Sequence, residues 1–138
     1  MKKTTLVALV LLSLLPAACA AKPVTGEVVQ VAGGSYRNIT AAELAAILDN
    51  KDFVLVNVHI PFEGDLPGTD LSIPYDQIEQ NLSQLPADRN ARIVLYCRSG
   101  RMSAIAAESL VRLGYTDIWD LEGGMLAWEA AGFPLKDE

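Results

Sequence analysis

The 138-residue chain has few of the residues that build disulfide frameworks or metal sites. It contains two cysteines, Cys19 and Cys97, and one histidine, His59. A single histidine with one free cysteine does not make a metal site. We therefore expect neither a metal ion nor another cofactor.

Positive charge is also scarce. The chain has 11 lysines and arginines against 17 aspartates and glutamates, a net charge of −6. A domain this acidic is a poor ligand for the phosphate backbone of nucleic acids, so we predict no nucleic-acid partner. Against this background, a local pair of arginines is informative.

Long apolar runs are absent as well. The longest extends from Leu6 to Leu15 and is interrupted by Ser13, which is shorter than the roughly 20 residues that a membrane-spanning helix needs. Lys2 and Lys3 precede it, and the small residues 17–21 follow it. This order is typical of a secretory signal peptide, so we expect an exported protein.

Two cleavage sites compete at the end of this segment. Leu15-Pro16-Ala17-Ala18-Cys19 resembles a lipoprotein box, with Pro16 in place of the usual aliphatic residue. Cleavage there would remove residues 1–18 and place a lipid anchor on Cys19, giving a periplasmic or cell-envelope lipoprotein. Ordinary cleavage after Ala20 would remove residues 1–20. We favour the lipoprotein, in which Cys97 is the only free thiol.

The remainder is long enough for one domain. Residues 19–35 contain several glycines and short polar residues, which is typical of a tether, although Val28, Val29 and Val31 could form a short edge strand. We place the folded domain at residues 36–136.

Strand and helix patterns alternate through this domain. Apolar, β-branched runs predict strands at 53–58, 92–96 and 117–121, and helices are predicted at 40–49, 75–85, 102–113 and 125–131. This alternation predicts an α/β fold with an open parallel sheet and helices on both faces.

Cys97 stands where such a sheet places its ligands. It directly follows the strand that ends at Tyr96, and the next helix begins near Met102. Ser99 and Gly100 supply the small positions that a tight reversal needs. A loop wound this way at a helix N-terminus directs several backbone N–H groups towards one point, which makes a cradle for an anion.

Two arginines add fixed positive charge to this loop. Arg98 and Arg101 flank Ser99 and Gly100. An electropositive cradle stabilises the thiolate, the nucleophilic form of Cys97, and attracts anionic substrates. Cys97 is therefore the candidate nucleophile, and residues 98–102 are the candidate substrate-binding loop.

Three segments of the second half resemble the rhodanese homology domain: residues 96–103, 113–115, and 120–125 with Trp128. The resemblance implies a rhodanese-like fold and a thiosulfate sulfurtransferase in which Cys97 carries a persulfide and passes the sulfur to cyanide or a thiol. It also implies that the backbone amides of Arg98, Ser99, Gly100, Arg101 and Met102 hold the persulfide. The side chains of Arg98 and Arg101 become candidates for binding the sulfonate end of the donor.

The first half departs from the family pattern. An acid-Val-Arg run is usual after the first central strand, whereas this chain has Asn57-Val58-His59. The usual Gly-His-Ile-Pro-Gly-Ala turn is replaced by residues 64–69, with Asp65 at the histidine position. His59 could line the pocket mouth, or it could simply fill the place of the arginine.

Two other functions stay open at this point. Cysteine phosphatases place an arginine six positions after the nucleophile, where this chain has Ser103. Phosphatase or arsenate reductase activity is therefore a distant alternative. A module that binds a partner protein or carries a persulfide, without turnover of free thiosulfate, is an alternative of another class.

Overall fold

Three short buried strands form the centre of the sheet. The computed structural model describes residues 22–136, in which β3 (Val54–Asn57), β5 (Ile93–Tyr96) and β6 (Ile118–Leu121) pair in parallel, with β5 in the middle. All residues of β5 and β6 are buried. Strands covered on both faces are apolar at nearly every position, which made these runs recognisable in the sequence.

Three outer strands complete a six-stranded sheet in the order β1-β2-β6-β5-β3-β4. The strand β2 (Gly34–Ile39) pairs in parallel with β6, and the two-residue strand β4 (Leu71–Ser72) pairs in parallel with β3. The strand β1 (Glu27–Val31) runs antiparallel to β2. The sheet is therefore mixed, and the prediction of a parallel sheet is corrected at this edge.

The hairpin also corrects the predicted tether. The edge strand considered at Val28–Val31 is present, and residues 27–35 belong to the sheet rather than to a linker. Ala32 and Gly33 form the turn between the two strands, and Gly33 has a positive φ of 90°. Only residues 22–26 of the described part of the predicted tether have no regular structure.

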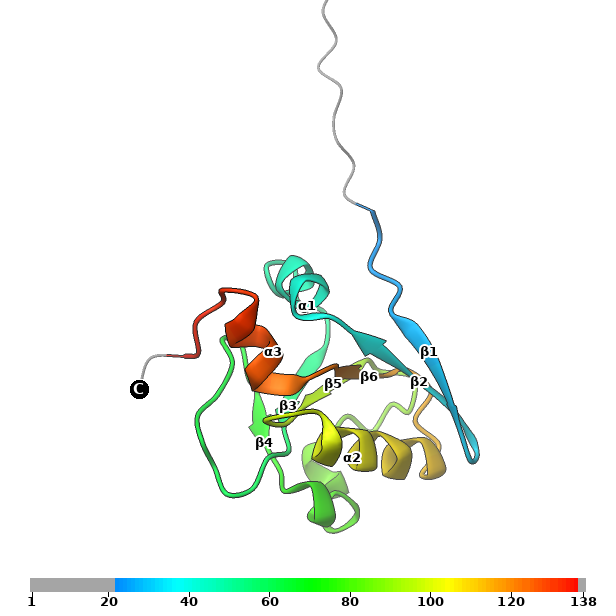
Figure 1. The fold of residues 1–138 in the computed structure, drawn as a ribbon. Coiled ribbons are helices and arrows are strands. Elements are labelled where there is room, and N and C mark those ends of the chain that lie inside the picture. The colour runs from blue at the N-terminus through cyan, green and yellow to red at the C-terminus, as the bar shows by residue number, and fades with distance from the viewer. Residues whose placement is uncertain (1–21, 137–138) are drawn as a thin grey trace, which may run out of the picture.

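Helices cover the two faces of the sheet as predicted (Figure 1). On one face lie α1 (Ala41–Leu48) and α3 (Gly124–Ala130), which contact each other. On the other face lie α2 (Arg101–Arg112) and the 3-10 segments η1 (Tyr75–Gln77) and η2 (Glu79–Gln84). The side chains of β3, β5 and β6 alternate between two apolar clusters, one under each layer.

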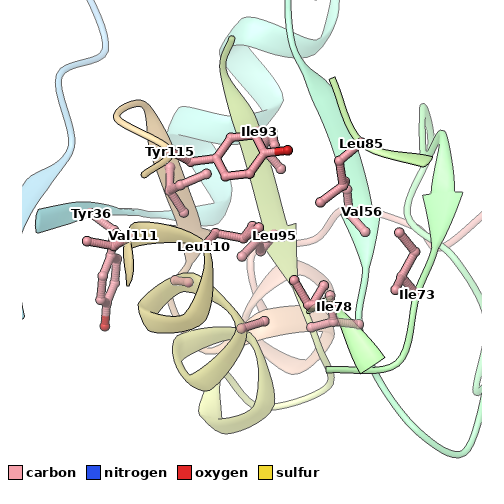
Figure 2. Packing of buried hydrophobic residues seen from close by; sticks show 14 of the residues in the cluster. Tyr36, Val56, Ile73, Ile78, Leu85, Ile93, Leu95, Leu110, Val111 and Tyr115 are labelled. Carbon is pink, nitrogen blue, oxygen red and sulfur yellow. The ribbon is translucent and has the colours of Figure 1, made fainter. Parts of the chain in front are cut away.

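The apolar cluster under α2 extends to Cys97, the candidate nucleophile. Leu110 of α2 lies against Leu95 of β5, and Val111 lies beside Tyr36 of β2, as Figure 2 shows. Cys97 belongs to the same cluster. The predicted loop-to-helix transition after β5 is confirmed, with α2 beginning at Arg101.

The predicted helix at 75–85 is wrong in type. Two 3-10 segments occupy it, and the backbone between them is non-helical at Asn81. The Asn81 side chain donates to the carbonyl oxygen of Gln77 at 2.8 Å and accepts from Gln84 at 2.7 Å. Asparagine side chains that bond nearby backbone groups compete with regular helix formation.

The predicted signal peptide and Cys19 lie outside the described residues. Export, lipid modification and the choice between cleavage sites therefore stay predictions from the sequence. Within residues 22–136, none of the helices has the length and apolar character needed to cross a membrane.

The first helix depends on its N-cap. Thr40 Oγ1 accepts a hydrogen bond from the Glu43 backbone at 3.2 Å, and a Glu43 carboxylate oxygen accepts from the Thr40 backbone at 2.8 Å. Ile39 and Leu44, on either side, are both buried. Thr40 and Glu43 therefore form a capping box, and the buried flanking pair occupies the positions of a hydrophobic staple.

Thr40→Ala will lower the free energy of unfolding by about 1 kcal/mol, because the N–H group of Glu43 loses its acceptor. Urea titration of both proteins measures the loss. Thr40→Ser, which keeps the hydroxyl, serves as the control and should stay close to wild type. Equal midpoints for Thr40→Ala and wild type would show that the cap contributes nothing.

Candidate active site

Cys97 is the first residue after β5, at the carboxyl edge of the sheet. Its thiol is free and 1% exposed. The sulfur accepts a hydrogen bond from the Gly100 backbone at 3.0 Å and lies 3.5 Å from the Ser103 hydroxyl, which donates to it. Gly100 is the N-cap of α2 and has φ of 98°, a left-handed conformation that favours glycine. The sulfur therefore sits at a helix N-terminus, where anions are stabilised.

The nucleophile loop is held from behind by the first turn of α3. The backbone of Met125 donates to the Cys97 carbonyl at 2.9 Å, and that of Leu126 donates to the Arg98 carbonyl at 3.0 Å. The approach is so close that a Cβ on Gly124 would lie 2.3 Å from the Cys97 oxygen. Gly124 also has φ of 58°. Glycine is the only residue that allows this contact.

A buried polar pair lies beside the sulfur. Ser103 is fully buried, and Asp120 of β6 is 3% exposed, with Oδ1 making no hydrogen bond to any described residue. Burial raises the pKa of Asp120 to about 7, although a hydrogen bond with Ser103 acts in the opposite direction. The Ser103 hydroxyl therefore lies close to both the Cys97 sulfur and the Asp120 carboxyl group.

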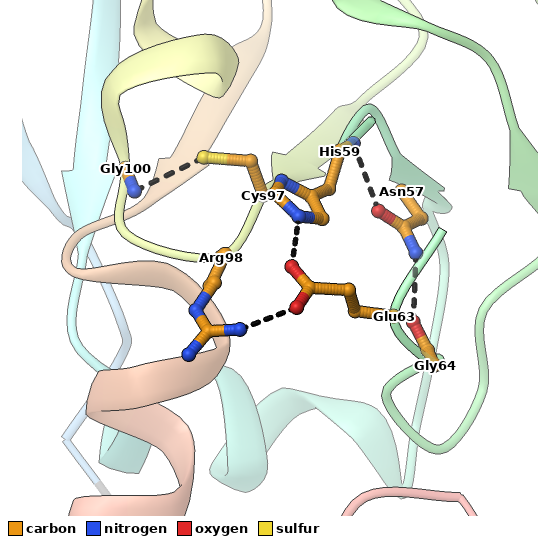
Figure 3. Close-up of polar contacts among 7 residues, drawn as sticks. All are labelled: Asn57, His59, Glu63, Gly64, Cys97, Arg98 and Gly100. Atoms are coloured by element: carbon orange, nitrogen blue, oxygen red, sulfur yellow. Dashed lines mark hydrogen bonds and ion pairs between the residues drawn. The ribbon is translucent and has the colours of Figure 1, made fainter. Parts of the chain in front are cut away.

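A second group of polar residues lies beside the loop, after β3. The backbone of Val58 donates to the Tyr96 carbonyl at 2.9 Å, so the residues after β3 run next to Cys97. His59 is 9% exposed, and its Nε2 contacts the Glu63 carboxylate. The other Glu63 oxygen accepts from the Arg98 guanidinium (Figure 3). The predicted site residues His59 and Arg98 are therefore joined through Glu63.

The loop between His59 and Glu63 is shaped by Asn57. The Asn57 side chain accepts from the His59 backbone at 3.0 Å and donates to the Gly64 carbonyl at 2.9 Å (Figure 3). It also donates to Asp65 Oδ1 at 2.9 Å. One fully buried amide thus holds both ends of the loop. Only a side chain that both donates and accepts can do this, and an ionised aspartate at position 57 could not donate.

Tyr96 fixes the same loop from β5. Its hydroxyl donates to Asp65 Oδ1 at 3.0 Å and accepts from the Leu66 backbone at 3.0 Å. Asp65, which replaces the histidine of the family pattern, therefore takes hydrogen bonds from both Asn57 and Tyr96. The two departures from the pattern, at positions 57 and 65, contact each other directly.

The remaining predicted loop residues have different surroundings. Ser99 and Arg101 are exposed, and Arg101 forms no ion pair with any residue of the described chain. Met102 is partly buried against the cluster under α2. Across residues 22–136, no three histidine, cysteine or acidic side chains gather as a metal site would require.

Three residues of the site were missed by sequence reasoning: Glu63, Ser103 and Asp120. Ser103 follows the loop by one turn of α2, so helical periodicity could have placed it near Cys97. Asp120 interrupts an apolar strand, which is a signal for a buried polar role. Glu63 lies in an irregular loop, and no local pattern relates it to Arg98, 35 residues away.

The family model of the rhodanese-like domain matches residues 40–131 of this chain. The match begins at the N-cap of α1 and ends at the C-cap of α3, and it includes every residue of the site described above. The chain belongs to the rhodanese-like domain family.

Curated relatives of this rhodanese-like domain include named sulfurtransferases. It is 36% identical over 92 residues to the "Sulfurtransferase" of Allochromatium vinosum, covering 64% of this chain and 83% of that protein. It is 29% identical over 104 residues to the thiosulfate sulfurtransferase GlpE of Pseudoalteromonas translucida, covering 70% and 92% of the two chains. It also matches 27% of the length of the probable adenylyltransferase/sulfurtransferase MoeZ of Mycobacterium tuberculosis, at 37% identity over 110 residues.

A solved structure shares the rhodanese-like fold. The rhodanese-related protein of Thermoplasma volcanium is 31% identical, with a TM-score of 0.64, and the alignment covers 75% of this chain and all of that chain. The predicted rhodanese-like fold and single-domain organisation are confirmed. The family and its relatives support sulfur-transfer chemistry in general terms.

Gly124→Ala will destabilise the rhodanese-like domain by about 2 kcal/mol or more. The positive φ alone costs an L-residue about 1–2 kcal/mol, and the new methyl group also meets the Cys97 carbonyl. Thermal unfolding measures the loss. The matched control is Gly132→Ala, where φ is 88° and no atom lies within 4 Å of the added Cβ. Equal losses in the two variants would show that the contact with the loop is unimportant.

The charge of Asp120 will make stability fall as pH rises from about 4 to about 7. In this range Asp120 keeps its proton in the folded protein but has lost it in the unfolded chain, because folding raises the pKa of Asp120 from 3.8 to about 7. The free energy of unfolding then declines with pH, by up to about 4 kcal/mol for three pKa units. Asp120→Asn should remove this decline.

Unfolding midpoints of wild type and Asp120→Asn at pH 5 and pH 8 measure this effect. Relative to wild type, the unfolding midpoint of Asp120→Asn should be higher at pH 8 than at pH 5. Asp76→Asn, at an exposed carboxylate, should show the same pH dependence as wild type. Parallel pH profiles for wild type and Asp120→Asn would contradict the assignment.

Proposed function

We propose that this protein is a sulfurtransferase that takes a sulfane sulfur from a small anionic donor such as thiosulfate and carries it on Cys97 as a persulfide. The observation that supports this most strongly is the Cys97 sulfur at the N-terminus of α2, with the Gly100 N–H 3.0 Å away. That position favours a negative charge on the thiolate before transfer. It would favour the negative persulfide equally after transfer.

The first half-reaction moves one sulfur atom. The Cys97 thiolate attacks the outer sulfur of thiosulfate, a new S–S bond forms, and the S–S bond of the donor breaks. Sulfite leaves with the bonding electron pair, and the persulfide keeps one negative charge. No proton has to move in this step, so the site needs anion stabilisation more than a general base.

The second half-reaction returns the thiolate. Cyanide attacks the outer sulfur of the persulfide and leaves as thiocyanate, while the bonding electrons return to Cys97. A thiolate acceptor would leave in the same way, as a persulfide. The Ser103 hydroxyl, 3.5 Å from the sulfur, is placed to stabilise the returning negative charge.

The place of action is a further proposal, and it rests on residues 1–21 alone. The charged start, the short apolar run and the cysteine after small residues favour an exported protein with a lipid anchor on Cys19. Small donors and acceptors of the cell envelope would then be its substrates.

Intact-mass spectrometry after incubation with thiosulfate tests the reaction. Wild type should gain one sulfur atom, which peptide mapping locates on Cys97 and cyanide removes as thiocyanate. Cys97→Ser should gain none while unfolding at the same temperature. Sulfur uptake by Cys97→Ser would refute the role of Cys97.

The alternatives give different results in the same series. Hydrolysis of a phenyl phosphate without any sulfur uptake would favour the phosphatase. Failure to take sulfur from thiosulfate or any other sulfane donor would favour a module that binds a partner protein. Uptake without turnover would favour a persulfide carrier.

A further inference from the structure

An acidic side chain, Glu63, forms an ion pair with Arg98, one of the two arginines that were expected to bind the donor. The two carboxylate oxygens of Glu63 contact different partners, one the Arg98 guanidinium and the other Nε2 of His59 (Figure 3). Arg98 is half exposed, so it lies where a soluble donor can reach it. Its charge is nevertheless already paired within the protein.

The position of Glu63 is built into the fold. Asn57 holds the His59–Gly64 segment at both ends, through the His59 backbone and the Gly64 carbonyl. The Val58–Tyr96 backbone bond places the start of that segment beside the start of the Cys97 loop. Glu63 is therefore held against Arg98 by buried hydrogen bonds and does not depend on a surface ion pair alone.

Glu63 keeps its negative charge in this setting. The hydrogen bond with His59 is the main cause that holds the pKa of Glu63 below its usual value, and Arg98 acts in the same direction. The ionised carboxylate accepts a hydrogen bond from the Arg98 guanidinium and also contacts the His59 ring. Any anion that approaches Arg98 meets this charge.

We propose that Glu63 is a specificity-determining residue that disfavours dianionic sulfur donors and favours sulfane-sulfur donors with one negative charge or none. The proposal rests on the proposed function and names the substrate class of the same site. Glu63 engages Arg98, and its charge repels each negative charge of the donor. Because Coulomb repulsion is proportional to the donor's charge, a dianion is disfavoured twice as strongly, in free energy, as a monoanion.

Two donors of similar shape but different charge make it possible to measure the effect of donor charge apart from that of donor size. Thiosulfate carries two negative charges, and methanethiosulfonate replaces one charged oxygen with a methyl group and carries one. Both present the same terminal sulfur to Cys97. The first releases sulfite and the second releases methanesulfinate, each leaving with the electron pair of the broken S–S bond.

The test compares kcat/KM for these donors in wild type and Glu63→Gln, with cyanide as acceptor. Glutamine keeps the shape and can still contact Arg98 and His59, but it carries no charge. If one unit of donor charge is worth about threefold, Glu63→Gln should gain about tenfold with thiosulfate and about threefold with methanethiosulfonate. Both gains should shrink as salt is added.

Glu27→Gln is the matched control. Glu27 is exposed on β1, at the opposite edge of the sheet from β3, and forms no ion pair with any described residue. Its removal should change the ratio of the two kcat/KM values by less than twofold. Equal thermal unfolding of the variants would show that the fold is unaffected.

The outcomes separate this proposal from the proposed function. Sulfur transfer in both proteins with an unchanged donor ratio, or a loss of thiosulfate activity in Glu63→Gln, would overturn the role of Glu63 and leave sulfur transfer standing. Absence of transfer from either donor, in wild type and variant alike, would refute the sulfurtransferase itself and this proposal with it.

Discussion

The close contact between the Gly123-Gly124 turn and the Cys97 loop is the constraint on which the site depends. The first turn of α3 donates two backbone hydrogen bonds to the loop carbonyls. Only glycine fits at position 124, because any Cβ there would collide with the Cys97 carbonyl oxygen. The loop is therefore fixed on one side by α3, while the Gly100 N–H group donates to the sulfur at the start of α2. A cradle that is already formed before substrate arrives has no reorganisation cost during the reaction. The helices on opposite faces of the sheet thus meet at the nucleophile.

The residues after β3 differ from the family pattern, although the fold is the same. Asn57 and Asp65 stand where the family pattern has an acid and a histidine, and in this structure they hydrogen-bond to each other. Their contact keeps a polar connection between β3 and the following loop, although its charges have changed. The same amide directs the segment that carries His59 and Glu63 towards Arg98. The departures from the family pattern in the first half therefore act on the charges around Arg98, while the loop around Cys97 is formed by the second half.

Local sequence patterns were a good guide wherever structure depends on neighbours in the chain. The run from Ile93 to Tyr96, the small residues of the loop and the stripe on α2 predicted a strand, a reversal and a helix in the right places. The helix predicted at 40–49 begins after Thr40 as expected, because Thr40 and Glu43, three residues apart, form a capping box. The sequence was a poorer guide to the short 3-10 segments and to the outer strands of the sheet. At Asn81 a side chain competed with the helix, and in β2 and β4 the strands are defined by pairing with distant partners.

Local sequence was enough to show that Cys97 follows a buried strand, precedes an amphipathic helix and lies in an arginine-containing loop. These are properties of the 20 consecutive residues from Ile93 to Arg112, and backbone geometry converts them directly into an anion cradle. The surroundings of that cradle depend on the tertiary fold: the Gly124 contact, the burial of Asp120 and the pairing of Glu63 with Arg98. Each of these joins segments that are far apart in the chain. Their meeting depends on the order of strands in the sheet and on how the loops pack at its carboxyl edge, which no local pattern encodes.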